Sequence, residues 1–531
     1  MSSEQQLGRL VSISGAQVIA LLDNSPASDD GGVAVSVGSL VKMETAHSHV
    51  YGMVTGQSIP IPSQDGGPEE LRISELELVG EVPLPPAESA GVFTRGITLS
   101  PGLGDPVFSA DSTDIATVYA QPNEATIAIG NIHLEKNLPA HVGVDNLLGK
   151  HFAILGTTGC GKSCAVSLLL HEMIKQHPNA HVLLLDSHGE YEAAFGDIAE
   201  QITPSDLEIP YWLFSFDEFC AVVFGRETDD LVTEVALLRD LIQKSKLRFL
   251  GEQGEEYPIT VDTPVPYKMG DLNRLLDETM GKLENRNELA PYLRIRNRLN
   301  TLANDRRYSF IFPSSLVVRD NMATLLSRMF RIPVNEKPIS ILNLTGVPSE
   351  ILNVVISVIC RLTFDFGQWS EPQMPILLVC EEAHRYAPNN SVSEFEPAKE
   401  ALSRLAKEGR KYGISLGVVS QRPSELAVGV LSQCSTVFAM RMTSQKDQDF
   451  IQAAISDSAV GLIESLPSLG NAEAIAVGEG VPVPMRLSFK SLPENQRPKS
   501  ATAQFAKSWS GEAGTIEGLQ DTIERWRSQR R

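Results

Sequence analysis

The chain has 531 residues and a formal net charge of −21 at pH 7. It is therefore too long for one ordinary hydrophobic core and too acidic to coat nucleic acid over its whole surface. Hydrophobic residues make up 42% of the chain and charged residues 21%, which excludes a mainly disordered protein. No uninterrupted run of 18 apolar residues occurs, and the polar start at Met1–Arg9 has no apolar h-region. We therefore expect two or three folded domains in a cytoplasmic protein without a membrane segment.

The cysteines do not suggest a cross-linked or zinc-bound protein. None of them forms a CxxC pair, and most lie in apolar runs, where a thiol behaves as a small buried hydrophobe. The six are Cys160, Cys164, Cys220, Cys360, Cys380 and Cys434.

The N-terminal part of the chain predicts a small β-barrel over residues 1–95. Short apolar runs alternate there with glycine-containing turns at near-regular spacing, which is typical of a barrel. We expect this module to serve docking or assembly, followed by a connecting segment over residues 96–150. The predicted strands are Leu10–Ile13, Val18–Leu22, Val33–Val37, Tyr51–Val54 and Ile73–Val79.

Beyond residue 150 the pattern changes to alternating strands and helices, which predicts an α/β core with a parallel sheet. The core is expected to comprise residues 151–200 and 341–492. Its predicted elements are the strands His151–Leu155, Val182–Leu185, Ile376–Cys380, Ile414–Ser420 and Thr436–Met442 and the helix Ser163–Gln176.

Two further regions are expected outside this core. A helical insertion over residues 201–340 contains an amphipathic helix near Leu231–Ile242 and a second helix starting near Asp271. Between Lys282 and Arg307 it carries seven basic and three acidic residues, which fits either a basic binding face or a solvated helix surface. Residues 493–531 form a polar tail whose last helix cannot bury its apolar face alone, so we expect it to dock on its own core or on a neighbouring subunit.

The segment from Gly156 to Ser163 fits the pattern GxxxxGK[ST] between a predicted strand and a predicted helix. Glycines in such a loop let backbone N–H groups surround phosphate oxygens, and the helix N-terminus adds its dipole. Lys162 would reach the β- and γ-phosphates, and the Ser163 hydroxyl would bind Mg²⁺. The residues predicted to bind ATP are Gly156, Thr157, Thr158, Gly159, Cys160, Gly161, Lys162, Ser163 and the adjoining Cys164.

An apolar strand that ends in two acids supplies the carboxylates that nucleotide hydrolysis needs. Glu381 follows the run Ile376–Cys380 at the position where a metal-associated aspartate usually stands, and we expect it to hold Mg²⁺. Glu382 is the candidate base that orients the attacking water.

Two later stretches add candidate residues around this site. Gln421 directly follows the apolar strand Ile414–Ser420, and at this position it could sense the γ-phosphate. Arg410 or Lys411, if exposed at a subunit edge, could reach a neighbour's nucleotide as an arginine finger; the less favoured alternative is a surface helix end without such a role. His188 and Glu190 follow the strand Val182–Leu185 in the stretch DSHGEY, and their roles stay open.

With GTTGCGKS, DSHGEY, CEEAHRYAP, EGRKYG and SQRPSEL in that order, the chain resembles the HerA family of hexameric DNA-translocating ATPases, relatives of FtsK and the conjugative pumps. The resemblance covers nearly the whole chain. It implies a HAS-type N-terminal barrel, a RecA-like motor core with a helical insertion, and a C-terminal extension that braces adjacent subunits. It also implies double-stranded DNA in the channel of a homohexamer and a partner such as a NurA-like nuclease, or an antiphage effector such as a sirtuin-type NADase or another nuclease.

Carried over to this chain, the resemblance implies Lys162 for phosphate, Ser163 and Glu381 for Mg²⁺, and Glu382 for water, with Gln421 as sensor and Arg410 as the trans-acting finger. Two residues depart from the family pattern. Glu381 stands where many members have aspartate, and its longer side chain should still reach the ion. Cys160 replaces a commoner serine or alanine, which could make the loop sensitive to thiol reagents.

Three functions are compatible with these residues. The first is an ATP-driven DNA translocase or helicase that works with a partner nuclease or effector in DNA-end processing or antiphage defence. The second is an ATP-binding ring that acts mainly as a scaffold to assemble and activate its partner. A pump that moves protein through a membrane pore is a weaker third hypothesis, because no membrane segment is expected.

Overall fold

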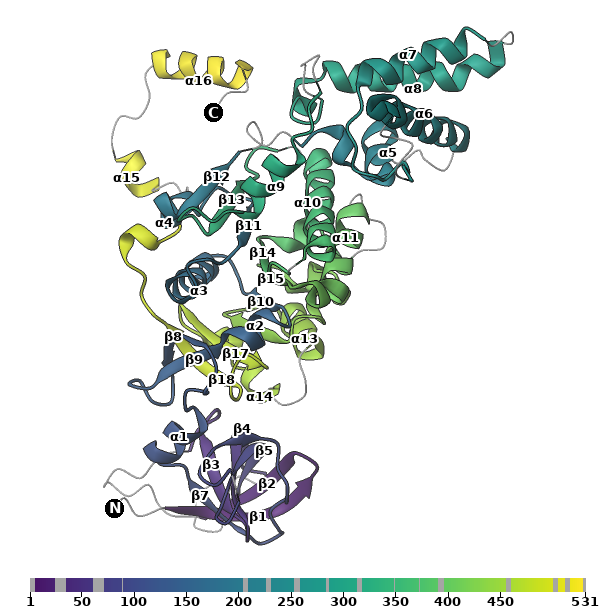
Figure 1. The fold of residues 1–531 in the computed structure, drawn as a ribbon. Helices are drawn as coiled ribbons and strands as arrows, with labels where there is room; N and C mark the ends of the chain where they lie inside the picture. The colour runs from purple at the N-terminus through teal and green to yellow at the C-terminus, as the bar shows by residue number, and fades with distance from the viewer. Residues whose placement is uncertain are drawn as a thin grey trace.

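The protein has three parts in the computed structural model: a barrel at one end, a central α/β body and a projecting arm of helices (Figure 1). The structure describes residues 5–23, 35–60, 71–87, 89–203, 209–225, 231–252, 258–282, 286–312, 318–347, 349–371, 373–389, 396–454, 460–499, 505–510 and 516–528. This arrangement confirms the predicted fold class, an N-terminal small barrel followed by a P-loop α/β core.

The barrel is closed because its first and last strands in spatial order, β2 and β5, pair with each other. Closure leaves no open sheet edge among these strands, so their backbone groups pair within the barrel. Around the barrel the strands are β2 (Gln17–Leu22), β1 (Gln6–Ser14), β7 (Pro106–Ser109), β3 (Leu40–Glu44), β4 (Ser48–Ser58) and β5 (Arg72–Pro83), with β6 (Thr94–Arg95) added to β5.

Four of the five strands predicted for the barrel lie within β1, β2, β4 and β5. The prediction for Val33–Val37 is wrong for residues 35–37, which form a loop and turn, and its first two residues lie outside the described part. Gly38 follows with a φ of +90°, a turn conformation that ends an extended segment. The strand comes after it as β3, whose Leu40, Val41 and Met43 are buried.

The expected connecting segment 96–150 is divided between two sheets by strand pairing. β7 lies between β1 and β3 of the barrel, so barrel strands extend past residue 95. The helix α1 (Ser112–Val118) then packs on the barrel through Asp114, which accepts a hydrogen bond from Tyr51 at 2.8 Å and lies 3.3 Å from Lys42. The next strands, β8 (Thr126–Ile132) and β9 (Pro139–Gly143), belong to the sheet of the central body.

The central sheet has eleven strands in the order β12-β13-β11-β14-β15-β10-β16-β17-β18-β8-β9. From β12 to β16 the neighbours are parallel, and from β16 to β9 they are antiparallel. The parallel strands are almost entirely buried, as expected for a sheet covered on both faces. Their bounds are β10 (Phe152–Leu155), β11 (Val182–Asp186), β12 (Ala199–Ile202), β13 (Ile339–Asn343), β14 (Ile376–Cys380), β15 (Ile414–Ser420) and β16 (Thr436–Met440), followed by β17 (Glu473–Gly478) and β18 (Met485–Phe489).

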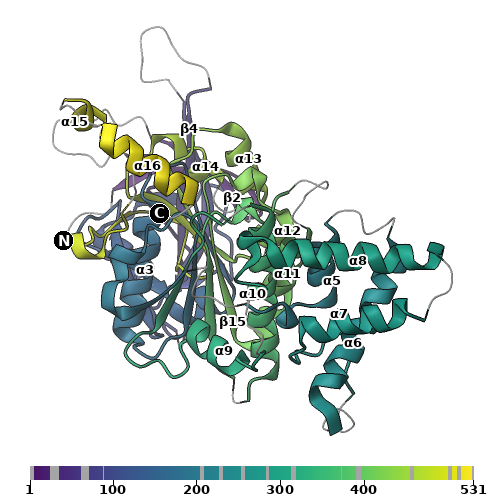
Figure 2. The same cartoon turned by 90° about the horizontal axis from the view of Figure 1, so that it is seen from above.

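Helices cover both faces of this sheet, as Figure 2 shows, with α3 on one side and α10 and α11 on the other. Among the described residues, one helix is long and apolar enough to span a bilayer, through its segment Ile351–Trp369. In the fold, 78% of that window is buried, so α10 serves as a core helix. The helices of the body are α2 (Val144–Leu148), α3 (Lys162–Gln176), α4 (Glu192–Phe195), α9 (Met322–Phe330), α10 (Ser349–Trp369), α11 (Glu396–Glu408), α12 (Val428–Leu431), α13 (Gln445–Ala454) and α14 (Val460–Ile463).

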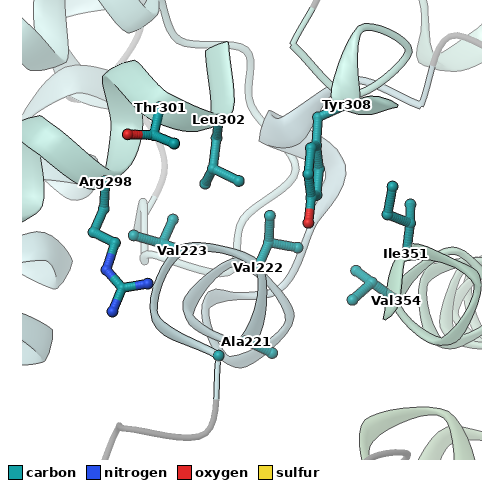
Figure 3. Close-up of a pocket in the computed structure, with 10 residues that line it drawn as sticks. Ala221, Val222, Val223, Arg298, Thr301, Leu302, Tyr308, Ile351 and Val354 are labelled. Carbon is teal, nitrogen blue, oxygen red and sulfur yellow. The ribbon is translucent and has the colours of Figure 1, made fainter. Parts of the chain in front are cut away.

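Four helices within the predicted insertion form the arm, which extends away from the body in both views, whereas α9 of the same range packs on β11 and β13. Where α5 and α8 of the arm meet α10, side chains of all three helices surround a cavity of about 280 Å³ (Figure 3). Its lining is mainly apolar, with Val222, Leu302 and Ile351 from the three helices, so the joint is packed by hydrophobic side chains. The arm helices are α5 (Phe216–Phe224), α6 (Val232–Leu250), α7 (Met269–Met280) and α8 (Arg286–Asn304).

A buried ion pair also ties the arm to the body. Arg361 of α10 lies 3.0 Å from Glu218 of α5, whose side chain is 5% exposed. Glu218 also accepts a hydrogen bond from Ser357 at 2.9 Å and from the backbone N–H of Ser215, which caps α5. One carboxylate therefore holds the start of α5 against the core helix.

We expect Arg361→Ala to lower the free energy of unfolding by about 3–5 kcal/mol, because it leaves the buried Glu218 carboxylate without its counter-charge. Urea unfolding followed by circular dichroism measures this loss. Lys407→Ala is a control at an exposed cation of α11. A change below about 1 kcal/mol in Arg361→Ala, the usual value for surface pairs, would contradict the structural role.

The C-terminal tail leaves the body after β18 and ends in two short helices, α15 (Phe505–Trp509) and α16 (Ile516–Ser528). The apolar face of α16 is not buried on its own chain, since Ile516, Leu519 and Trp526 are 77%, 59% and 79% exposed. Docking of this helix on its own core is therefore not seen. A segment before it, residues 490–499, packs against α3 and α4 through the bond from Ser167 Oγ to the Gln496 carbonyl oxygen.

Candidate functional site

The glycine-rich loop lies between the end of β10 and the start of α3, at the carboxyl edge of the parallel sheet. Gly159 and Gly161 have φ values of +78° and +108°, which L-residues with a side chain rarely adopt. At Gly156 a Cβ atom would lie 2.8 Å from both Met440 and Cys160, so only glycine fits the close approach to β16. The loop therefore has the backbone conformation that a phosphate cradle requires.

Polar side chains of this loop contact groups of the same edge of the sheet. Lys162 is 8% exposed, and its Nζ donates to the carbonyl oxygen of Thr157 at 3.0 Å. Ser163 Oγ donates to Glu190 Oε2 at 3.0 Å. Thr158 Oγ1 donates to Gln421, which brings the end of β15 onto the loop. Lys162 and Ser163 would therefore both be available to a phosphate bound in the loop.

The two acids that follow β14 lie at the same edge of the sheet as this loop. Glu381 is 3% exposed and Glu382 is 6% exposed, and an Oε2 atom of each is buried without a hydrogen-bond partner. Burial raises the pKa of Glu381 well above its usual range, and the Asp186 and Glu190 carboxylates raise it further. Burial also raises the pKa of Glu382, while the Lys162 ammonium opposes this shift.

The stretch DSHGEY forms a tight turn at the end of β11. Asp186 stabilises the turn itself. Its carboxylate accepts hydrogen bonds from the backbone N–H groups of His188, Gly189 and Tyr191 at 3.1, 2.8 and 3.0 Å. His188 is exposed, which excludes a core role for its ring. Glu190 is half-buried and points to Ser163.

A hydrogen-bonded network links the acids to the end of β15. Gln421 accepts the hydrogen bond of Thr158 in the loop, and its side chain also lowers the pKa of the candidate base Glu382. Nδ1 of His384 lies 3.3 Å from Glu382 Oε2 and 3.1 Å from Ser420 Oγ. Burial lowers the pKa of His384 to about 4, so its ring is neutral at pH 7 and adds no positive charge beside Glu382.

Sequence reasoning missed three side chains that shape this site. Tyr191 donates to Glu381 Oε1 at 3.0 Å, and Tyr386 donates to the Glu381 carbonyl oxygen at 2.9 Å. The third is His384. All three lie inside the motifs DSHGEY and CEEAHRYAP, so the motif letters themselves were the available signal.

Arg410 does not join the other candidates in this chain. It lies exposed in the turn before β15, whereas Gln421 follows that strand, and a seven-residue strand spans about 20 Å. Arg410 therefore stands at the amino edge of the sheet, beside a cavity of about 880 Å³ that also borders α2 and the end of α3. This position excludes contact with its own glycine-rich loop.

The two loop cysteines differ in access to solvent. Cys160 is fully buried against Met440, and burial raises the pKa of its thiol. The predicted sensitivity of Cys160 to thiol reagents is therefore not supported, because reaction requires an accessible thiolate. Cys164 is exposed in the first turn of α3, next to Ser163.

The donor set fits a magnesium ion shared with phosphates. Among the described residues, no group of three or more His, Cys, Asp or Glu side chains could hold a metal by itself. Ser163 and the unpartnered buried oxygen of Glu381 instead offer one or two protein ligands, the number that Mg²⁺ uses beside phosphates and water. A divalent cation would also supply the positive charge that the buried carboxylates lack.

Three arginines of the basic stretch in the arm pair with neighbouring acids. Arg294 pairs with the buried Glu234, Arg296 lies 3.1 Å from Asp277, and Arg307 lies 2.7 Å from Asp305. The first two pairs join α8 to α6 and α7, which favours a solvated helix surface over a basic binding face. Because each of these three arginines is paired with an acid, they do not support DNA binding by the arm.

Part of the chain matches a known family, and most of it is similar to known helicases. The model of the central domain of the helicase HerA matches residues 127–363, which include the glycine-rich loop and the DSHGEY turn. A probable helicase of Methanocaldococcus jannaschii is 28% identical over 392 residues, which cover 72% of this chain and 70% of that protein. The DNA double-strand break repair helicase HerA of Pyrococcus furiosus is 26% identical over 450 residues, covering 76% and 75%.

A solved structure shares the fold. VirB4 of Thermoanaerobacter pseudethanolicus superposes with a TM-score of 0.51 at 16% identity, over 71% of this chain and 99% of that one. The loop geometry, the paired acids after β14 and the matched sequences together identify an ATP-hydrolysing P-loop protein that is similar to the HerA helicases and whose residues 127–363 match their central domain.

Proposed function

We propose that this protein is an ATP-driven motor that moves double-stranded DNA through a ring of six copies in the cytoplasm. The observation that carries the proposal is the convergence of Lys162 and Ser163 with two buried, unpartnered carboxylate oxygens at one edge of the sheet. Such a site provides a cation for phosphate, a ligand for Mg²⁺ and a base for water. The related proteins named as DNA repair helicases support DNA as the substrate.

Each residue takes a distinct role in hydrolysis. Lys162 moves from the Thr157 carbonyl oxygen to the β- and γ-phosphates, and the loop N–H groups hold the phosphate oxygens. Glu382 accepts the proton of the attacking water, helped by a raised pKa that brings it closer to neutral pH. Gln421 bonds to Thr158 of the loop and directly follows β15, so it can report γ-phosphate loss to the end of that strand.

Mg²⁺ would be held by Ser163 and Glu381, and it would neutralise charge that develops on the phosphates. Glutamate in place of the common aspartate is accommodated here. Tyr191 holds one carboxylate oxygen of Glu381 and leaves the other free.

DNA contact is expected inside the ring channel, because the net charge of −21 and the paired arginines of the arm disfavour binding elsewhere. Arg410 on the amino edge of the sheet would complete the site of an adjacent copy. We place a partner nuclease or defence effector on the barrel, which contributes none of the residues proposed to act on ATP.

The test is steady-state ATP hydrolysis of the purified oligomer with and without linear duplex DNA. A motor is expected to be stimulated by DNA, to lose this stimulation as salt increases, and to be inactive as Lys162→Ala. The other candidate class, a scaffold that binds ATP to assemble a partner, predicts hydrolysis that DNA does not change. Unstimulated hydrolysis of an intact ring would therefore reject the motor.

A further inference from the structure

Glu190 makes a contact that the proposed hydrolysis scheme does not use. Its Oε2 accepts the hydrogen bond of Ser163 Oγ at 3.0 Å, although Ser163 is the residue expected to bind Mg²⁺. Glu190 comes from the turn after β11, and Ser163 from the first turn of α3. Two elements of the sheet edge therefore meet at the hydroxyl that the ion needs.

The four acids at this edge are in different states. The Asp186 carboxylate accepts hydrogen bonds from three backbone N–H groups. Glu381 and Glu382 each have a buried carboxylate oxygen without a hydrogen-bond partner. Of the four, Glu190 is the one that bonds to the serine. The unpartnered oxygens of Glu381 and Glu382 are available to bind a cation, whereas the Glu190 carboxylate accepts a hydroxyl proton.

We infer that Glu190 is a positioning residue that orients the Ser163 hydroxyl for the cation without binding the cation itself. A hydroxyl has one proton and two lone pairs, so donation of the proton to Glu190 leaves the lone pairs for the ion. A carboxylate in this position also makes the ligand oxygen more electron-rich, as carboxylates behind metal ligands do. The inference rests on the proposed ATPase function.

Tyr191 is the competing acceptor, because its hydroxyl also hydrogen-bonds with Ser163. Its own proton goes to Glu381 Oε1 at 3.0 Å. A carboxylate accepts a hydroxyl proton more strongly than a neutral phenol does, which favours Glu190. The backbone of Glu190 is also held, since its carbonyl oxygen accepts the Lys499 N–H at 2.9 Å.

The test separates nucleotide binding from Mg²⁺ binding. Binding of a fluorescent ATP analogue to the full-length oligomer is measured without Mg²⁺ and across a Mg²⁺ titration. Glu190→Ala is expected to lower Mg²⁺ affinity by about 10–100-fold, the usual cost of losing a group behind a metal ligand. Binding without Mg²⁺ should be unchanged or tighter, because a negative charge near the phosphates is removed.

Three further variants make the result specific. Glu192→Ala removes the same charge from an exposed position two residues away and should behave as wild type. Glu190→Gln keeps an acceptor oxygen and should recover much of the lost Mg²⁺ affinity. In Ser163→Ala, adding Glu190→Ala should have no further effect, because the acceptor then has no hydroxyl to orient.

Additive losses in the Ser163→Ala background would overturn the inference, and so would an equal loss of binding with and without Mg²⁺, which indicates a structural role. Wild-type Mg²⁺ affinity in Glu190→Ala would also reject it while leaving the ATPase function standing. If the wild-type protein binds no nucleotide at all, the proposed function itself fails, and this inference fails with it.

Discussion

Arg410→Ala is expected to lower kcat for ATP hydrolysis by about 10³–10⁵-fold, the range for loss of an arginine finger. In this chain the guanidinium stands at the amino edge of the sheet, a strand length of about 20 Å from the glycine-rich loop. It can act only on the nucleotide of another copy. Nucleotide binding should therefore remain close to that of wild type, because Lys162 and Ser163 are unchanged.

Mixing variants tests whether the arginine acts between copies. Arg410→Ala keeps an intact loop and acids, and Lys162→Ala keeps the arginine, so interfaces that combine the two regain one complete site. We expect the inactive proteins to recover partial activity when assembled together. Lys411→Ala is the matched control, since Lys411 is the exposed cation next to it. Equal losses of ATPase activity in Arg410→Ala and Lys411→Ala would argue against a finger at Arg410. The absence of recovered activity on mixing would argue against it as well.

Glu382→Gln is expected to lower kcat by about 10²–10⁴-fold, the usual contribution of a positioned base. The amide keeps the size of the side chain but cannot take a proton from water. The affinity for ATP should stay close to that of wild type. Glu400→Gln, at an exposed position on α11, is the control for a glutamate-to-glutamine change that leaves the site intact.

The stability of this variant distinguishes lost chemistry from lost folding. The pKa of Glu382 is raised in the folded protein, so its ionised form is disfavoured there relative to the unfolded chain. The resulting cost is absent below the pKa of the unfolded carboxyl and grows as the pH rises through the folded pKa. A neutral glutamine removes this cost, so we expect thermal stability at pH 8 to equal or exceed that of wild type. A clear drop would indicate that the loss of activity reflects unfolding.

Features encoded in contiguous residues could be predicted from the sequence. The position of the glycine-rich loop between a strand and a helix is predictable because its glycines, lysine and serine lie within eight neighbouring positions. β14 and β15 were predicted to the residue, since uninterrupted apolar runs bounded by polar residues are typical of buried parallel strands. The order of the motifs along the chain was sufficient to suggest the family.

Only the tertiary structure decided features that depend on distant residues. β8 joins the central sheet through β18, more than 350 positions later, so no local pattern could assign it to the core rather than to a connecting segment. The charge of the arm was misleading for the same reason. Arg294, for example, pairs with Glu234, which lies 60 positions away in the sequence.

The states of the four acids were likewise invisible in the sequence. Asp186, Glu190, Glu381 and Glu382 look alike as letters, yet one shapes a turn, one holds the Ser163 hydroxyl and two keep free oxygens. Arg410 and Gln421 lie eleven positions apart in the sequence but at opposite edges of the sheet. Motifs determined which chemical groups this protein has, whereas burial and long-range hydrogen bonds, which form only on folding, decided which of them are available for chemistry.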